Sequence, residues 1–521
     1  MATRKARLAF AIKRFKGFLE ALRRSKRGLL GITVLIVSCI VAVSAPLLTH
    51  HHPITDRNLA GSASPPVWYR YFPGGESLSE NFNPILDPEF SSSSALNEWN
   101  VTISPSVQNV FVQHVSDVGY PSSPGCLEVI YGSSSEISMD SEVKIQIMKE
   151  FYYPFSGIPG IMTIDAKVLL ARIEGVSIQV MLVLQQNWPV NVAPDLFKYN
   201  VTKWYFGQRS YLYPQGRPEI YTEMDFTTSR RVLDWISPEG GLQFKRETEG
   251  AALRQLFPKA GNYAYGIEIT IKKLEPSAEA IVYVDRLDIP LKGTAFGLLG
   301  TDGYGRDVYT QLIYGTQISL FVGLLATILS VVIGLVVGLV AAYLGGIADE
   351  VLMRFTDALI VLPGLPLMII LMTVLSSSQY NMTTFIIVIG FLGWMGFARV
   401  VRSQVLSLKE RPYVEAAKAV GAGTPYILAR HILPNVVSLI YVTLALSVPS
   451  AIVAEAALSF LGFVDPNVMS WGRMLQEGGI RPEYWWWVLP PGIAIAILSL
   501  SFILLGYALD EILNPKLRMR R

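Results

Sequence analysis

Long, predominantly apolar runs mark two parts of this chain. The first run extends from Gly28 to Leu48. At about 1.5 Å per residue a helix of this length crosses a hydrocarbon core of roughly 30 Å. Five further runs in the C-terminal half occupy about 317–343, 352–376, 383–403, 436–462 and 487–509. The pattern therefore predicts six membrane-spanning helices, with both termini on the same side.

Between residues 50 and 294 the pattern changes to short segments that resemble β-strands. The segments 176–184, 263–271 and 280–289 are rich in β-branched and aromatic residues and are bounded by turn formers. They predict an antiparallel β-sandwich of the jelly-roll type. Aromatic residues in this region fill the core or, as the alternative, form a sugar-stacking platform; they include Trp188, Tyr199, Trp204, Tyr205, Tyr211, Tyr213 and Tyr221.

Charge decides the predicted orientation. Residues 1–27 carry many Lys and Arg residues and a single acid, Glu20. Because cytoplasmic flanks of spanning helices are enriched in basic residues, both termini are expected in the cytoplasm and residues 50–294 outside the cell. The basic tail also has apolar residues at helical spacing, so an amphipathic helix on the inner leaflet and a simple orienting flank remain alternatives.

The composition supports this topology and excludes other classes. Hydrophobic residues make up 51% of the chain and charged residues only 16%, which is a membrane-protein balance. The first run is too long for a signal peptide and lacks a small-residue cleavage site after it, so an uncleaved anchor is expected. The net charge of +3 is explained by the helix flanks and gives no indication of nucleic acid.

Candidate chemistry is sparse. Cys39 and Cys126 fall on different segments, so no disulfide is expected. Three adjacent histidines, 50–52, point in different directions and predict no metal site. The chain has no G-x-x-x-x-G-K-S/T phosphate loop, so it is not expected to hydrolyse ATP itself.

The segment between the fourth and fifth runs carries the most specific motif. It is too polar to span a membrane and predicts two short helices, 413–420 and 425–433, joined at 421–423. Small side chains allow close docking of a partner, and a glycine allows a sharp turn. The motif positions are Glu415, Ala416, Ala417, Gly421, Ile432, Leu433 and Pro434. A short amphipathic interfacial helix is the alternative interpretation.

A second motif precedes the second run. Residues 299–308 read Leu-Gly-Thr-Asp-Gly-Tyr-Gly-Arg-Asp-Val. Further matches are 349–354 with Asp357, 454–462 and 470–472. Together these segments resemble the C-type permease subunit of the dipeptide, oligopeptide and nickel ABC importers. The resemblance covers about 1–50 and 295–521, and its motif residues include Gly300, Thr301, Asp302, Gly305, Arg306, Asp307 and Glu455.

This resemblance implies an all-α, six-helix permease of the type I importer fold with an inserted extracellular domain. It divides the chain into a tail (1–27), a first helix (28–49), the inserted domain (50–294) and a permease core (295–521) with the coupling loop at 405–435. It implies a second, B-type permease subunit, two ATPase subunits that bind ATP and Mg, and an external solute-binding protein. No cofactor is expected in this chain, and it is not expected to be an enzyme.

Two departures leave the cargo open. Phe296-Gly297-Leu298 replaces the usual His-Pro, and a domain-sized insertion replaces a short outer loop. Di- and oligopeptides are the expected cargo, with oligosaccharides as the alternative. A different class, a membrane-anchored carbohydrate-binding ectodomain, is the less favoured hypothesis.

The spanning segments add two smaller expectations. Glu455 is expected to brace its helix or, as the alternative, to line the translocation path. Prolines inside the runs are expected to kink or break their helices, at Pro363, Pro366 and Pro449.

Overall fold

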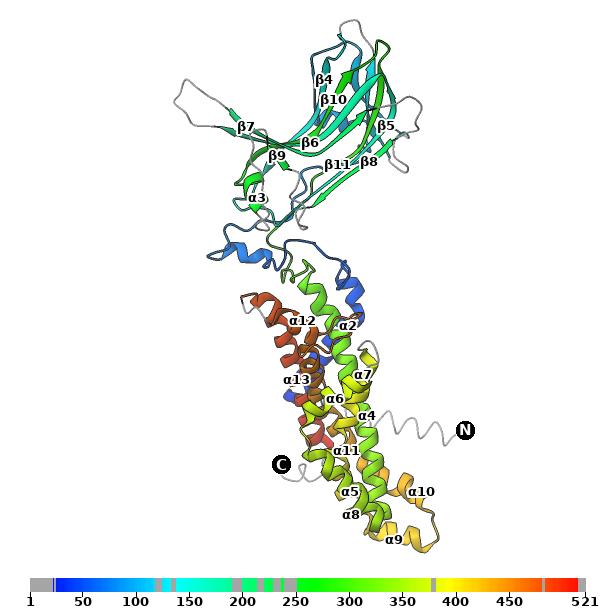
Figure 1. Cartoon of the computed structure of the whole chain (residues 1–521). Helices are drawn as coiled ribbons and strands as arrows, with labels where there is room; N and C mark the ends of the chain where they lie inside the picture. Colours follow the sequence, from blue (N-terminus) through cyan, green and yellow to red (C-terminus); the bar gives the residue numbers. More distant parts are fainter. Residues whose placement is uncertain are drawn as a thin grey trace, which may run out of the picture. The chain divides into compact units, whose positions relative to one another are not determined.

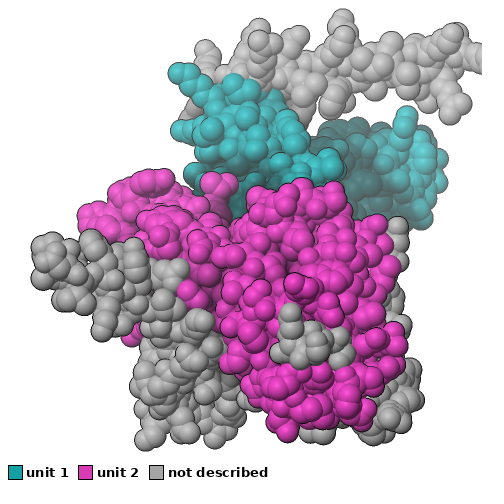
Figure 2. All heavy atoms as spheres, turned by 90° about the horizontal axis from the view of Figure 1, so that it is seen from above, with its two compact units in different colours: residues 1–56, 307–521 teal, residues 57–306 magenta. Residues whose placement is uncertain are grey.

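The computed structural model divides the chain into two compact units, residues 1–56 with 307–521 and residues 57–306 (Figure 2). The backbone is described for residues 22, 25–116, 118, 124–132, 137–189, 199–212, 220–227, 236–238, 251–375, 381–479 and 483–513. The basic tail and the residues after 513 lie outside this set. So do the side chains of residues 187–252, which include the predicted aromatic platform.

The first unit is helical, as the apolar runs predict (Figure 1). Its longer helices are α2 (Lys26–Leu48), α4 (Val308–Leu344), α5 (Gly346–Val361), α6 (Gly364–Leu375), α7 (Met382–Gly393), α8 (Met395–Lys409), α11 (Leu433–Phe460) and α13 (Trp485–Leu513). Short helices are α9 (Pro412–Ala419), α10 (Thr424–Ile427) and α12 (Trp471–Gly478).

Four of the six predicted spans are continuous helices and two are bent. Helices α2, α4 and α13 and the run Thr424–Phe460 are each long and apolar enough to cross a membrane. The third span divides into α5 and α6, which meet at 97°, and the fourth into α7 and α8, which meet at 43°. If each bent pair is one span, the described residues contain the six that the sequence predicts.

Proline explains one of these breaks but not the other. Leu362 precedes Pro363 and has an extended backbone (φ −69°, ψ 138°), because the proline ring disfavours helical geometry at the residue before it. Pro366 and Pro449 lie within α6 and α11, which continue through them. The bend between α7 and α8 occurs at Trp394 without a proline.

The second unit is a β-sandwich of two antiparallel sheets (Figure 1). One sheet has the order β1 (Asn100–Ser104), β4 (Glu142–Tyr153), β10 (Gly261–Lys273), β6 (Val176–Pro189), β7 (Tyr199–Leu212), β9 (Ile236–Pro238). The other has the order β12 (Leu291–Lys292), β5 (Ile161–Glu174), β11 (Glu279–Asp288), β3 (Cys126–Gly132), β2 (Val110–Val115), and β8 (Ile220–Thr227) also pairs with β5.

One hydrophobic core joins the two sheets. Val143, Ile145 and Ile147 alternate along β4 and face the same core as Leu127 and Val129 of β3. This alternation places every second side chain of a strand in the interior. The predicted strands 176–184, 263–271 and 280–289 correspond to β6, β10 and β11, so the sandwich expected from the sequence is present.

Candidate coupling site and motif segments

Helix α9 begins the segment that the sequence singled out between the fourth and fifth spans. Pro412 occupies its first turn, where a missing N–H has no helical partner to lose, and Glu415 places a negative charge near the positive end of the helix dipole. The helix ends in paired hydrogen bonds: the N–H of Gly421 donates to the carbonyl of Lys418 (2.9 Å) and that of Ala422 to Ala417 (3.1 Å). This arrangement is a Schellman motif.

Gly421 is required by the backbone of this turn. Its φ is +83°, in the region that side-chain-bearing residues avoid. A Cβ built on Gly421 meets no atom within 4 Å, so the constraint comes from the backbone conformation and not from crowding. The predicted turn at 421–423 is therefore present, and its geometry explains the glycine.

The segment is anchored on one side and open on the other. Val414, Ile427 and Ile432 are buried in a cluster with residues of α4 and α8. Ala417 and Ala422 pack partly against the same cluster, whereas Glu415, Ala416 and Gly421 are exposed. Three of the apolar positions therefore hold the segment in place while these three motif positions face solvent.

The second predicted helix of this segment differs from expectation. Residues 424–427 form α10, residues 428–432 form a π-helix, and the chain continues directly into α11. The predicted 425–433 helix is therefore the beginning of the fifth span. The wider π-turn precedes Pro434, which has no N–H to donate to the carbonyl of Arg430. Leu433 is half-buried and Pro434 is exposed.

Aromatic contacts hold the exposed side of the segment together. The rings of Tyr413 and Tyr426 lie 6.2 and 5.8 Å from the ring of His431, measured between centroids. The Lys418 ammonium lies 5.9 Å from the centroid of Tyr343 on α4. Val420, at the tip, is 84% exposed.

In the motif at 299–307, by contrast, the residues from Gly300 to Asp307 that the motif specifies are buried. Asp302 and Arg306 form an ion pair (Nε to Oδ2, 2.5 Å) with side chains no more than 1% exposed. The other oxygen of Asp302 accepts from the backbone N–H groups of Tyr304 (2.8 Å) and Arg306 (2.9 Å). Gly300 and Gly305 have φ of +73° and +70°, which close the turns on either side.

This motif joins the two chain segments that enter and leave the β-rich unit. The Thr301 hydroxyl donates to the carbonyl of Gly61 (2.7 Å) and accepts from the N–H of Ser64 (2.9 Å). The N–H of Asn58 donates to the carbonyl of Tyr304 (3.1 Å). Residues up to 306 therefore fold with the β-rich unit, although the sequence grouped the motif with the permease core.

Asp307, the last motif residue, begins the second span. Its carboxylate accepts from the N–H groups of Tyr309 (3.2 Å) and Thr310 (3.0 Å), which makes it the N-cap of α4. Every position from Gly300 to Asp307 that the motif specifies thus has a structural reason within this chain.

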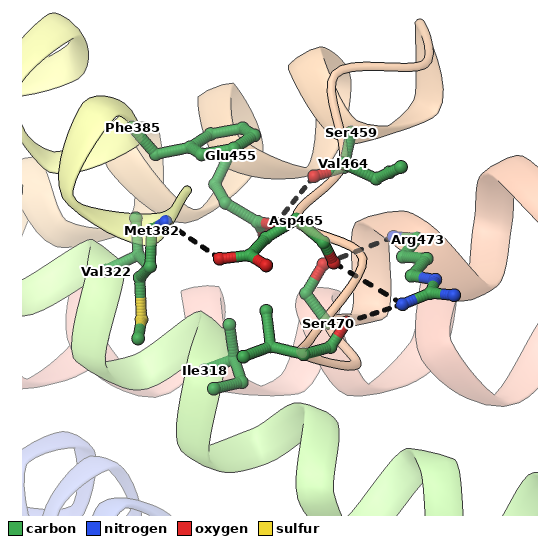
Figure 3. Close-up of a pocket in the computed structure, with 11 residues that line it drawn as sticks. Ile318, Val322, Met382, Phe385, Glu455, Ser459, Val464, Asp465, Ser470 and Arg473 are labelled. Atoms are coloured by element: carbon green, nitrogen blue, oxygen red, sulfur yellow. Dashed lines mark hydrogen bonds between the residues drawn. The ribbon is translucent and has the colours of Figure 1, made fainter. Parts of the chain in front are cut away.

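Glu455 lies in the interior of the helical unit, on α11 (Figure 3). It is 3% exposed, and Ser459, one turn later, donates a hydrogen bond to its carboxylate (2.8 Å). The hydroxyl groups of Ser319 on α4 and Ser470 at the start of α12 also lie next to the carboxyl. Contacts with two other helices, α4 and α12, favour the bracing role, although a small cavity also borders Glu455.

Residues of the loop after α11 also line this cavity (Figure 3). Asp465 accepts a hydrogen bond from the N–H of Met382 at the start of α7 (3.1 Å). Arg473 donates to the carbonyls of Pro466 (3.2 Å) and Val468 (2.9 Å) and pairs with Glu477 (2.9 Å). These bonds fix the loop against α7 and α12.

The Ser-Trp-Gly match at 470–472 also has a packing explanation. Ser470 caps α12 by accepting from the N–H of Arg473 (3.2 Å), and the Trp471 indole donates to the carbonyl of Leu312 (3.0 Å). A Cβ on Gly472 would lie 2.7 Å from the Cα of Ala456, so only glycine lets α12 approach α11 this closely.

Two ion pairs between α5 and α8 were not predicted from the sequence. Arg402 donates two hydrogen bonds to Asp349 (2.5 and 2.6 Å), and Arg399 pairs with Asp357. In the sequence, the two aspartates were noted only because they match the family motifs, and the two arginines only as part of a basic helix flank. Only the spacing of these residues along their helices could have indicated the ion pairs: eight positions separate the acids and three separate the arginines.

Two of the three adjacent histidines make local contacts. The ring of His52 accepts from the N–H groups of Ile54 (3.3 Å) and Thr55 (3.2 Å). His51 lies 3.7 Å from Asp56. No group of three metal-ligating residues occurs among the described residues.

Comparison with known proteins identifies the class. The family model of the binding-protein-dependent transport system inner membrane component matches residues 330–519. The dipeptide permease protein DppC and the oligopeptide permease protein OppC of Bacillus subtilis are each 41% identical over 222 residues. That alignment covers 42% of this chain and 68% and 72% of the two relatives.

The glutathione permease protein GsiD of Pectobacterium atrosepticum is 37% identical over 225 residues, which cover 42% of this chain and 73% of the relative. The fold and these matches define an integral membrane permease. The chain belongs to the family of ABC importer permease subunits that includes the dipeptide and oligopeptide permeases.

Solved structures give weaker likenesses. An inward-facing MetNI methionine ABC transporter chain matches with a TM-score of 0.33 at 19% identity, over 39% of this chain and 94% of that chain. A carbohydrate-binding module of the β-sandwich superfamily matches with a TM-score of 0.23 at 10% identity, over 40% of this chain and 61% of that chain. At these scores neither likeness supports an argument about ligand.

Proposed function

We propose that this chain is the C-type permease subunit of an ATP-driven importer that moves di- and oligopeptides into the cell. It pairs with a second, B-type permease subunit, and an external solute-binding protein delivers the cargo. Two separate ATPase subunits bind ATP and Mg, and this chain contributes no cofactor. Both termini lie in the cytoplasm, and the β-rich unit lies outside.

The observation that carries this proposal is the exposed half of the segment 411–434. Glu415, Ala416 and Gly421 match the coupling motif of the family, yet none of them is buried by this chain. Small exposed residues on a rigid, core-anchored turn form a surface to which another protein can dock closely. A push on this turn passes to α4 and α8 through Val414 and Ile427. ATP-driven closure of the ATPases would use this connection for alternating access.

The docking surface is tested by a point substitution rather than a deletion. Deleting 412–434 would remove buried residues of the helical core, so loss of binding would not be specific. Ala416→Arg adds a long charged side chain at an exposed position, and Ala429→Arg makes the same change at an exposed alanine outside the motif. Co-purification of the ATPase subunit should be lost in the first variant and kept in the second. Normal ATPase binding by Ala416→Arg would contradict the coupling assignment.

The peptide cargo is supported by the relatives, which are named as dipeptide, oligopeptide and glutathione permeases. The oligosaccharide alternative is named by none of these three. Identification of the ligand carried by the partner solute-binding protein tests this part of the proposal separately, because cargo and coupling reside in different parts of the assembly.

A further inference from the structure

Exposed aromatic side chains gather at one end of the β-rich unit. The 3₁₀ helix η1 (Val67–Tyr71) and the residue after it carry Trp68, Tyr71 and Phe72, which are 38%, 84% and 53% exposed. Leu298 is 63% exposed, and the Trp68 indole donates to its carbonyl (2.8 Å). These four residues are called the aromatic patch below.

Contacts within the β-rich unit hold the residues of the aromatic patch in place. The rings of Trp68 and Phe72 are 5.8 Å apart and meet edge to face, and Tyr69 stacks with Phe72 at 6.5 Å. The N–H of Val67 donates to the carbonyl of Gly297 (3.1 Å), so η1 is fixed to the segment that carries Leu298. Exposed large apolar groups normally have a partner when they cluster in this way.

Chain connectivity ties the segment that carries Leu298 to the start of α4. Tyr304, 54% exposed, precedes Val308 by four residues, and an extended chain of four residues spans at most about 14 Å. Leu298 lies six residues further along the same segment. The aromatic patch is therefore tethered to the first turn of α4.

The first turn of α4 in turn lies level with the outer end of α2. Gln317 of α4 donates to the carbonyl of Ala42 on α2, which fixes the relative height of the two helices. From this contact α4 rises about 13 Å to Val308, and α2 rises about 9 Å to Leu48. A helix of 23 residues that starts at Lys26 crosses about 34 Å, so both ends reach the outer boundary of the hydrocarbon core.

We propose that the aromatic patch inserts into the headgroup region of the outer leaflet and holds the β-rich unit on the membrane surface. Trp and Tyr favour this region because their rings are apolar at one end and polar at the other. Arg57, exposed and stacked 5.4 Å from the centroid of Tyr304, adds a positive charge that suits lipid phosphates. The inference does not depend on the cargo or on ATP coupling.

The experiment uses the full chain in phosphatidylcholine vesicles with a fluorescent probe on an introduced cysteine. Cys39 is exposed in the first span and is replaced by alanine. Cys126 stays in place, because burial, together with the carboxylates of Asp285 and Glu128, raises the pKa of its thiol to about 12 and keeps it unreactive. Tyr71→Cys places the probe in the aromatic patch.

Met139→Cys provides the matched control at the other end of the sandwich. Met139 is 52% exposed and precedes the start of β4, whereas Arg70 of η1 lies over Phe155, just beyond the end of that strand. Because β4 has 12 residues, its ends are about 36 Å apart. Lipids spin-labelled at the headgroup should quench the probe at position 71 and leave the probe at position 139 unquenched.

Several results would overturn the proposal. Negligible quenching at both positions would mean that the patch does not reach the membrane. Shielding of the position 71 probe only after addition of the purified solute-binding protein would mean that the patch is a protein-docking site. Phe72→Asp, in the Tyr71→Cys background, should abolish the quenching because a carboxylate is expelled from the interface; unchanged quenching would also contradict insertion.

Discussion

The two motif-bearing segments of this permease use their characteristic residues in opposite ways. In the segment 299–307, the side chains of Thr301, Asp302 and Arg306 are buried. They form hydrogen bonds or an ion pair with other residues of the same unit. In the segment 411–434, Glu415 and Ala416 are exposed. The first motif is accounted for by the fold of this chain. The fold of this chain does not account for the second motif, and its exposed residues therefore indicate a binding partner.

The contrast concerns the kind of restraint as well as burial. The buried motif depends on paired charges, on a bridging hydroxyl and on glycine turns. The exposed motif depends on backbone conformation at Gly421 and on the absence of bulk at Ala416. Substitutions in the first should therefore act through stability, and substitutions in the second should impair function beyond any loss of stability. Four predictions test this division, from the largest expected change in stability to the smallest.

Arg306→Met should have the largest effect on stability. It leaves the Asp302 carboxylate buried without its ion-pair partner, and breaking a buried pair in this way costs about 3–5 kcal/mol. Thermal unfolding of the purified full chain, followed by limited proteolysis of the β-rich unit, measures the loss. Arg172→Met, which removes an exposed arginine paired with Glu174 and Glu279, should change little. Equal effects of the two substitutions would remove the distinction between buried and exposed pairs.

Thr301→Val should have the next largest effect. The substitution keeps the shape of the side chain but removes the hydroxyl between Gly61 and Ser64, and a buried N–H left without a partner costs about 1–3 kcal/mol. The same measurement on Thr102→Val, an exposed position on β1, is the control. A stability loss no greater than that of the control would show that the bridge is unimportant.

Gly421→Val should cost about 1–3 kcal/mol locally, because valine is forced into a left-handed backbone conformation. The turn should shift, and peptide uptake by the reconstituted transporter should fall while membrane insertion persists. Gly421→Asn is the informative comparison, since asparagine tolerates positive φ and the site has room for its side chain. Equal uptake by the Val and Asn variants would mean that the turn geometry does not matter.

Ala416→Arg should have the smallest effect on stability, within about 0.5 kcal/mol, because the position is a surface one. Uptake should nevertheless be abolished, which separates function from folding at this site. Ala429→Arg should leave both quantities unchanged. A large loss of thermal stability in Ala416→Arg, or normal uptake, would place this residue with the structural motif instead.

Patterns local in the sequence predicted much of the architecture. Six apolar runs, the strand-like segments between residues 50 and 294 and the glycine turn at 421 all correspond to observed elements. The bends at Leu362 and Trp394 show what local patterns can and cannot predict. Pro363 predicted the first bend, but no local sequence feature predicted the second. The continuation of residues 428–432 into α11 was likewise hidden, because the polar residues of that stretch suggested a separate short helix outside the membrane.

The sequence alone determined the family, the membrane location and the segment that we propose docks the ATPase, because hydrophobic periodicity and short motifs are local properties. Only the tertiary structure decided which motif residues are buried. Asp302 and Arg306 lie four residues apart, but their burial depends on contacts with residues 58–64, some 240 positions earlier in the chain. The aromatic patch likewise required the pairing of η1 with residues 297–298. Such long-range contacts follow from the packing of the whole unit and are not encoded in any one segment.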